Sequence, residues 1–185
     1  MMNSCHRFLC ALAFPLFLAL VACGSSGQPF VMDVQSDLIV TDVNPENLAV
    51  QTATGNLEAE VVDEFGDRLE LEVFSLGATA SFDGLGEVRL VLDPNFPANA
   101  TVYKLNRNNN PFGTNTMNLS LIIETPEQNL TLSNLTLSSD SALLELNQDL
   151  PPLTFFFQGV PMEIDLSTLQ IRIPASLIQS DFDPQ

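Results

Sequence analysis

The sequence predicts an all-β protein, an antiparallel β-sandwich or barrel-like sheet of about ten short strands with little helix. Three observations indicate this class. Apolar and polar residues alternate with a period of two through much of the chain beyond residue 30. Gly, Pro, Asn and Asp cluster at turn positions spaced roughly every 8–12 residues. No stretch of ten or more residues shows the spacing of an amphipathic helix.

Two hairpins are predicted in the first half of this region. The segments LEAEV (57–61) and LELEV (69–73) alternate apolar with acidic residues, and residues 63–67 turn the chain between them. The glutamates of both strands share one face, which must be solvated because like charges repel across a strand pair. A second hairpin is predicted over 78–92, where Asp83-Gly84 is a strong turn signal.

The next strands are predicted at 102–105, 119–123 and 142–146, separated by polar or Pro-containing loops. Between them lies NLTLSNLTLS (129–138), whose leucines occupy even positions in the first half and odd positions in the second. A slip of one residue exchanges the two faces of a strand. We therefore expect a bulge or a tight corner at Ser133-Asn134.

The C-terminal part begins with three consecutive aromatic residues, Phe155, Phe156 and Phe157. On a strand they point to both faces, which predicts either a strand covered on both sides or an exposed apolar contact surface for a partner or a lipid. A hairpin turn is expected at 158–161, a strand at 169–173, and one short helical turn within 175–182.

The first 22 residues are typical of a cleaved secretory signal. A polar start with Arg7 precedes a nearly unbroken apolar run over 8–22, which is shorter than the roughly 20 residues that a membrane span needs. We expect residues 23–29 to form a short tether and residues 30–185 to form a single acidic β domain.

The segment LVAC (20–23) resembles the lipobox of bacterial lipoproteins. The resemblance implies that the chain is cut before Cys23 and that its thiol and amino group carry diacylglycerol and an acyl chain such as palmitate. It further implies a bacterial cell-envelope protein held on a membrane. Gly24 stands where Asp favours inner-membrane retention in that family, which implies the outer membrane if the host is Gram-negative. Ordinary cleavage after Ala22 is the alternative.

Cleavage of the signal removes side chains that are often used in catalysis, namely the one histidine and two of the three cysteines. Cys5, His6 and Cys10 leave with it, so the exported domain has no histidine, and Cys23 is its one cysteine. Histidine-based nucleophile systems and His/Cys zinc sites therefore cannot be assembled. We expect a non-enzymatic protein, with a carboxylate-based hydrolase as the catalytic alternative.

The charge balance also limits the classes of partner that the protein can bind. Six Lys and Arg residues stand against 23 Asp and Glu residues, a net charge of −17. This balance argues against nucleic acid as a partner. We expect no cofactor; calcium is the metal that remains possible, with Asp63, Glu64 and Asp67 as candidate ligands, although they do not follow an EF-hand pattern.

Three functions remain open for the exported domain, and its protein or lipid partner is not identified by the sequence. The first is a membrane-anchored lipoprotein with a non-enzymatic β-sandwich that binds a partner or serves structurally. The second is a carrier of lipid or another hydrophobe, which requires a void of several hundred Å³ lined by residues such as Phe82, Phe155 and Phe157. The third is a calcium-dependent adhesion module.

Overall fold

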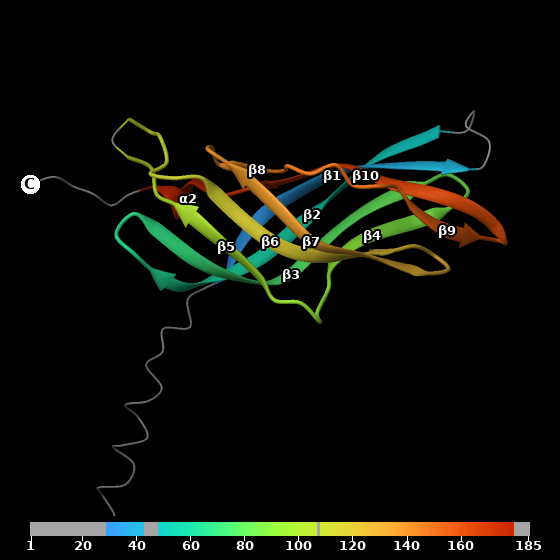
Figure 1. Ribbon diagram of the computed structural model, residues 1–185, viewed down its shortest axis with the longest axis horizontal. Helices are drawn as coiled ribbons and strands as arrows, with labels where there is room; N and C mark the ends of the chain where they lie inside the picture. Colours follow the sequence, from blue (N-terminus) through green and yellow to red (C-terminus); the bar gives the residue numbers. More distant parts are fainter. Residues whose placement is uncertain (1–28, 43–47, 107, 180–185) are drawn as a thin grey trace, which may run out of the picture.

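The computed structural model describes residues 29–42, 48–106 and 108–179, which form ten strands and one short helix. The elements are β1 (Phe30–Asp42), β2 (Leu48–Glu64), β3 (Arg68–Phe82), β4 (Gly86–Leu92), β5 (Ala98–Tyr103), β6 (Asn115–Glu124), β7 (Asn129–Ser139), β8 (Leu143–Leu146), β9 (Leu153–Phe157), β10 (Val160–Arg172) and α2 (Ala175–Ile178). Figure 1 shows them as one elongated body. The predicted all-β class is confirmed.

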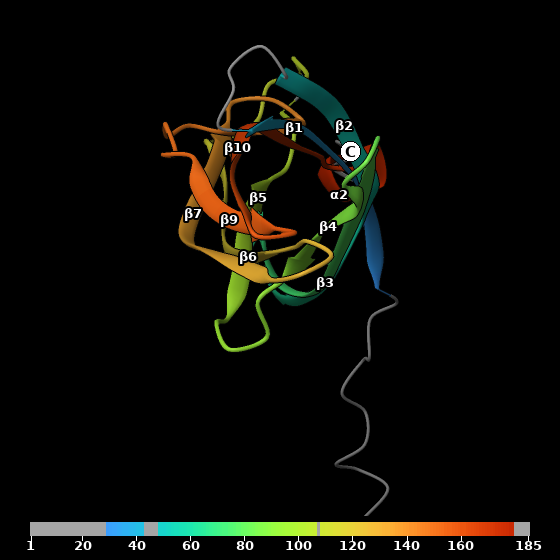
Figure 2. The same ribbon diagram turned by 90° about the vertical axis from the view of Figure 1, so that its right-hand side faces the viewer.

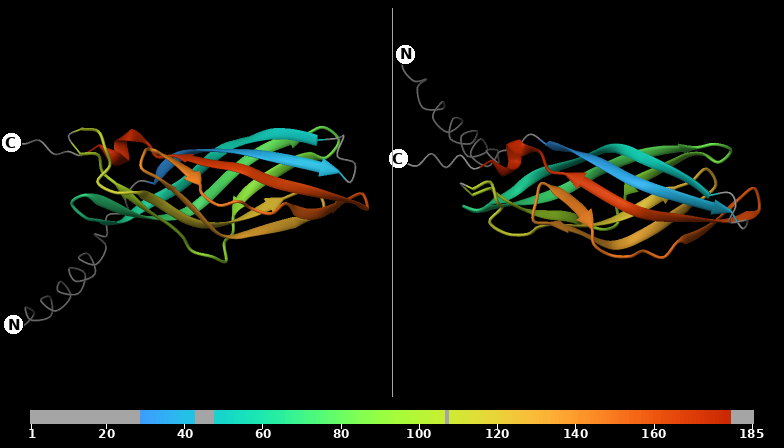
Figure 3. Two further views of the ribbon diagram at one scale, coloured as in Figure 1. Left: turned by 45° about the horizontal axis from the view of Figure 1, so that its top comes forward. Right: turned by 90° about the horizontal axis from the view of Figure 1, so that it is seen from above.

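All ten strands pair antiparallel in one sheet that returns to its own beginning. The order runs β1-β2-β3-β4-β6-β7-β8-β10, and β10 pairs in turn with β1. Figure 2 looks along the resulting ring, and Figure 3 shows the strands crossing its long axis obliquely. Of the two architectures predicted, the structure is therefore the barrel-like sheet.

The ten strands occupy eight positions around the ring, because two positions each hold two strands in succession. β4 and β5 lie one after the other between β3 and β6, pairing with opposite halves of both. β8 and β9 likewise pair with opposite ends of β10. Within the described ranges no ladder joins β9 to β7, so the ring is nearly but not fully closed.

The interior of the ring is filled by apolar side chains from every second residue. On β1, for example, the even-numbered residues Met32, Val34, Ser36, Leu38 and Val40 are all at most 3% exposed, while the odd-numbered residues between them are exposed or half-buried. Long runs of the same alternation occur on β3, β6 and β7. An eight-stranded barrel is just wide enough to be filled by side chains or to hold one small ligand.

β-Bulges in the ladders keep the apolar side chains on the inner face around the ring. The predicted bulge is confirmed: Ser133 and Asn134 of β7 oppose the single residue Ser120 of β6, and Asn134 has a φ of 58°. The backbone N–H of Asn134 donates to the buried Ser120 hydroxyl at 3.1 Å. The bulge keeps the leucines of both halves of the segment turned inward.

The predicted strands were too short. The two hairpins of the first half share one strand, the 15-residue β3, instead of being separate pairs. Phe74 is skipped in the pairing with β2, because Val73 lies opposite Ala59 and Ser75 lies opposite Glu58. This bulge moves the inward face from odd to even positions, so one strand can carry two alternation patterns of opposite phase.

The backbones of β2 and β3 approach each other closely at Gly55 of β2. A Cβ atom there would lie 1.8 Å from the carbonyl oxygen of Gly77 and 2.6 Å from the Cα of Ala78, both on β3. Backbone atoms cannot swing away as a flexible side chain can. Only glycine fits where the two strands come so close.

We expect Gly55→Ala to lower the free energy of unfolding by about 2–3 kcal/mol, because the added methyl forces the two backbones apart. The matched control is Gly77→Ala, since a Cβ at Gly77 meets nothing within 4 Å. That substitution should leave stability unchanged or raise it by about 0.5 kcal/mol. Urea unfolding of both variants checks the pair, and equal losses would contradict the close-approach explanation.

Candidate ligand pocket at the barrel mouth

One end of the barrel is formed by three turns and by the end of β1 and the start of β2. The turns are β3–β4 (83–85), β6–β7 (125–128) and β9–β10 (158–159). We call this end the mouth; it lies at the right of Figure 1 and faces the viewer in Figure 2. The chain enters β1 away from it, because Phe30 pairs with Ala59 whereas Thr41, near the mouth, pairs with Leu48.

The mouth holds a pocket of about 430 Å³, which we call the mouth pocket. It is lined by Val40, Leu48, Ala49, Phe82, Asp83, Gly84, Leu85, Phe157 and Met162. Val40, Phe82 and Leu85 are buried, while Ala49, Phe157 and Met162 are half-buried. The pocket therefore has an apolar floor and wall, and its ionisable group, Asp83, is exposed to solvent on a turn.

Two tight turns, both predicted from the sequence, frame this pocket. In the β3–β4 turn Gly84 and Gly86 have φ values of 81° and 96°. In the β9–β10 turn Gln158 and Gly159 have φ values of 50° and 78°. In the two-residue β9–β10 turn, positive φ at both central residues suits a hairpin. In the β3–β4 turn both positive φ values fall on glycines, which adopt them at little cost. These turns project Phe82 and Phe157 toward the pocket from opposite parts of the ring.

The free edge of β9 is held by side chains from the β6–β7 turn in place of a strand ladder. The Glu127 carboxylate accepts a hydrogen bond from the backbone N–H of Gln158 at 3.0 Å. The Gln128 side-chain oxygen accepts one from the backbone N–H of Phe156 at 3.4 Å. These two contacts, which the sequence did not reveal, fasten the β9–β10 hairpin to the β6–β7 turn beside it and bridge the gap between β9 and β7.

The aromatic run divides between three environments. Phe155 is fully buried in the barrel core, Phe156 is 55% exposed on the outer face, and Phe157 lines the mouth pocket. The prediction of an exposed apolar contact surface therefore applies to Phe156. Val160, at the start of β10, is 48% exposed nearby.

The three calcium candidates lie at the opposite end of the barrel, where the β2–β3 turn is exposed. Glu64 pairs with Lys104 at 2.5 Å, and Asp63 accepts a hydrogen bond from the Glu64 backbone. Within residues 29–42, 48–106 and 108–179, no three Asp, Glu, His or Cys side chains converge on a metal-sized site. Cys23 and the predicted signal lie outside these ranges.

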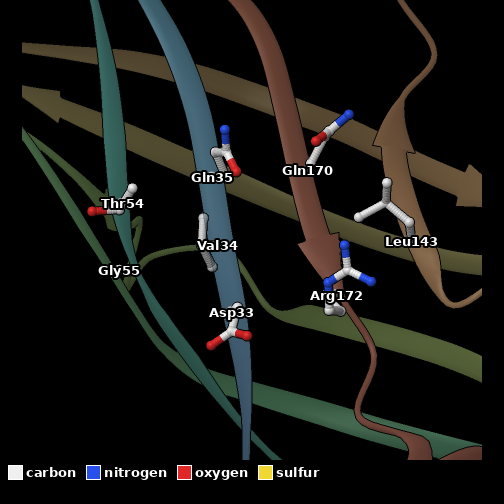
Figure 4. A pocket seen from close by; sticks show the side chains of 8 residues that line it. All are labelled: Asp33, Val34, Gln35, Thr54, Gly55, Leu143, Gln170 and Arg172. Carbon is white, nitrogen blue, oxygen red and sulfur yellow. The ribbon is translucent and has the colours of Figure 1, made fainter.

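A second, smaller pocket of about 240 Å³ lies along the side of the barrel (Figure 4). Its lining comes from β1, β2, β8 and β10: Asp33, Val34, Gln35, Thr54, Gly55, Leu143, Gln170 and Arg172. Asp33 and Arg172 are paired in the ladder, and Gln170 donates to Glu145 at 2.9 Å. Its polar groups belong to the outer face of the sheet, so we take the mouth pocket as the candidate site.

The fold and the pocket together define an antiparallel β-barrel with an apolar pocket open at one end. No protein-family model matches the chain, and no curated protein matches it significantly. Among solved structures it is similar to DynF from the dynemicin biosynthesis pathway of Micromonospora chersina. The TM-score is 0.53 at 10% sequence identity, and the match covers 78% of each chain. At this identity the likeness concerns the fold alone.

No helix in the described part of the chain has the length and hydropathy to span a membrane.

We expect Glu127→Ala to speed hydrogen exchange at the Gln158 amide by about two- to tenfold, because the variant loses one hydrogen bond worth about 0.5–1.5 kcal/mol. Glu127→Gln keeps an acceptor oxygen and should exchange more slowly than Glu127→Ala. Native-state exchange followed by NMR measures both. An unchanged rate in Glu127→Ala would show that this contact does not hold the hairpin.

Proposed function

We propose that this protein is a lipid-anchored cell-envelope protein whose β-barrel binds an apolar small molecule in the mouth pocket. The observation that carries the proposal is the mouth pocket itself. Its volume of about 430 Å³ falls in the range of roughly 300–1,000 Å³ typical of small-molecule sites. Its lining is mainly apolar, and its polar groups lie at the rim.

The lining residues favour a hydrophobe-binding barrel over a packed binding or structural module. A carrier requires a void lined by residues such as Phe82, Phe155 and Phe157, and two of these, Phe82 and Phe157, line the mouth pocket. Phe155 belongs to the packed interior instead. The calcium-dependent adhesion alternative has less support, because Glu64 is engaged by Lys104.

Burial of hydrocarbon is the chemistry that this pocket supports. Its nine lining residues include six with larger apolar side chains and two of the smallest residues, Ala49 and Gly84. Each methylene buried contributes about 0.8 kcal/mol, which corresponds to about a fourfold change in affinity. Binding strength should therefore follow the length of the ligand chain.

We expect straight-chain alkan-1-ols from hexanol to dodecanol to bind with Kd values that fall about fourfold for each added methylene. The trend should level off once the chain exceeds the pocket. Isothermal titration calorimetry on the exported domain measures the series. An affinity that does not depend on chain length would contradict burial in the pocket.

The neighbouring phenylalanines offer a matched pair of variants for the same titration. Phe157→Ala removes a wall of the mouth pocket and should weaken decanol binding about tenfold. Phe156→Ala removes the same side chain from the outer face and should change the affinity by less than about twofold. Thermal unfolding of both variants establishes that each is folded at the titration temperature.

The anchoring part of the proposal is supported by the resemblance of LVAC (20–23) to a lipobox. A single fatty chain gives marginal membrane binding, whereas two or more hold stably. The lipoprotein modification that the resemblance implies would supply enough chains at Cys23. Gly24 in place of Asp favours the outer membrane if the host is Gram-negative.

We expect the protein from native membranes to begin at Cys23 and to carry the added mass of diacylglycerol and an acyl chain. Cys23→Ser should lack that mass and leave the membrane fraction. Intact-mass analysis of both fractions makes the measurement. A wild-type protein that lacks acyl mass would remove the anchor and leave the ligand-binding proposal standing.

A further inference from the structure

The rim of the mouth pocket is acidic and has no basic group of its own. Asp83 is the ionisable residue among the nine that line the pocket, and its side chain is exposed on the β3–β4 turn. Whatever polar head an apolar ligand carries must stay near this rim when its chain enters the pocket, because burying a charge without a partner is costly. The charge of the rim therefore acts directly on the head group.

Four more carboxylates stand on the elements that form the mouth. Glu87 is the second residue of β4, beside the β3–β4 turn, and Glu124 ends β6. Glu127 holds the β9–β10 turn, and Glu163 follows the lining residue Met162 on β10. None of the four lines the pocket, but they stand at the mouth end on several sides of the ring, so their fields add at its opening.

The basic residues do not offset this field. The described ranges contain four, and Arg68, Lys104 and Arg172 lie at strand ends away from the mouth, with Arg68 and Lys104 paired to Glu70 and Glu64. Arg89 lies nearer, on β4, but it contacts two carboxylates, Glu124 at 3.2 Å and Glu87 at 3.9 Å. The mouth therefore keeps an excess of negative charge.

We infer that the mouth pocket selects amphiphiles with a cationic or uncharged head and rejects those with an anionic head, such as fatty-acid carboxylates. This inference rests on the proposed function, since it specifies the ligand class of the same pocket. An ammonium or hydroxyl head can donate hydrogen bonds to Asp83, whereas a carboxylate head has no donor and meets like charge. Selection of this kind weakens as salt screens the rim.

Three probes with the same ten-carbon chain test the inference: decylammonium, decan-1-ol and decanoate, each below its micelle concentration at pH 7.5. We expect decylammonium to bind at least as tightly as decanol, and decanoate to bind at least about tenfold more weakly than decanol. In 1 M NaCl, where the Debye length falls to about 3 Å, the difference between decylammonium and decanoate should shrink several-fold.

Asp83→Asn is the informative variant, because Asn-Gly serves the hairpin turn as well as Asp-Gly does. It should reduce the preference for decylammonium over decanoate several-fold, and decanol serves as the uncharged reference because its hydroxyl can still donate to the Asn side-chain oxygen. Asp63→Asn removes the same charge at the opposite end of the barrel and should change neither. A preference unaltered in the Asp83→Asn, Glu87→Gln double variant would overturn the assignment to the rim.

The outcomes separate this inference from the function on which it rests. If decanol binds and decanoate binds equally well or better, the head-group selection is wrong and the hydrophobe-binding function survives. If none of the three probes binds, the proposed function itself fails. If decylammonium and decanol bind and decanoate is rejected, with the rejection relaxed in Asp83→Asn, both stand.

Discussion

The pairing of the first strand with the last is the interaction on which the rest of this structure depends. β1 and β10 form a ladder from Asp33–Arg172 to Asp42–Met162, and this ladder turns an open sheet into a ring. No cysteine follows residue 23, so no disulfide can substitute for it. The ladder also places Val40 and Ala49 beside the hairpin that carries Phe157 and Met162, which makes the mouth pocket a product of ring closure.

Local features of the fold could be predicted from the sequence, and long-range ones could not. The turns at Asp83-Gly84 and Gln158-Gly159 and the bulge at Ser133-Asn134 were predicted, because each depends on neighbouring residues and on strand parity. Strand β1 was not predicted from the sequence, although Met32, Val34, Leu38 and Val40 all occupy even-numbered positions. Closure between residues about 130 positions apart leaves no local signal, so sandwich and barrel stayed equal alternatives.

The candidate site was predictable to a similar degree. Under the carrier alternative alone, Phe82 and Phe157 were expected to line a cavity, and their apolar character and strand parity sufficed for that. Phe155 was expected there too but belongs to the core, because the position of a side chain along a barrel depends on tilt and stagger that parity does not encode. The hydrogen bond from the Gln158 backbone N–H to the Glu127 carboxylate joins two loops about 30 residues apart. Such a contact could not be predicted from the sequence and is visible only in the structure.

Under the proposed function, the direction of β1 bears on the side from which a ligand would reach the mouth pocket. β1 runs toward the mouth, and its 13 residues extend about 40 Å at roughly 3.3 Å per residue. Because barrel strands tilt by about 35–45°, this length corresponds to a rise of about 30 Å along the barrel axis. A barrel fastened through Cys23 and standing upright on a bilayer would hold its opening that far above the lipids that secure it. Such an arrangement suits collection from the facing aqueous compartment, or from a second membrane opposite, better than extraction from the anchoring leaflet.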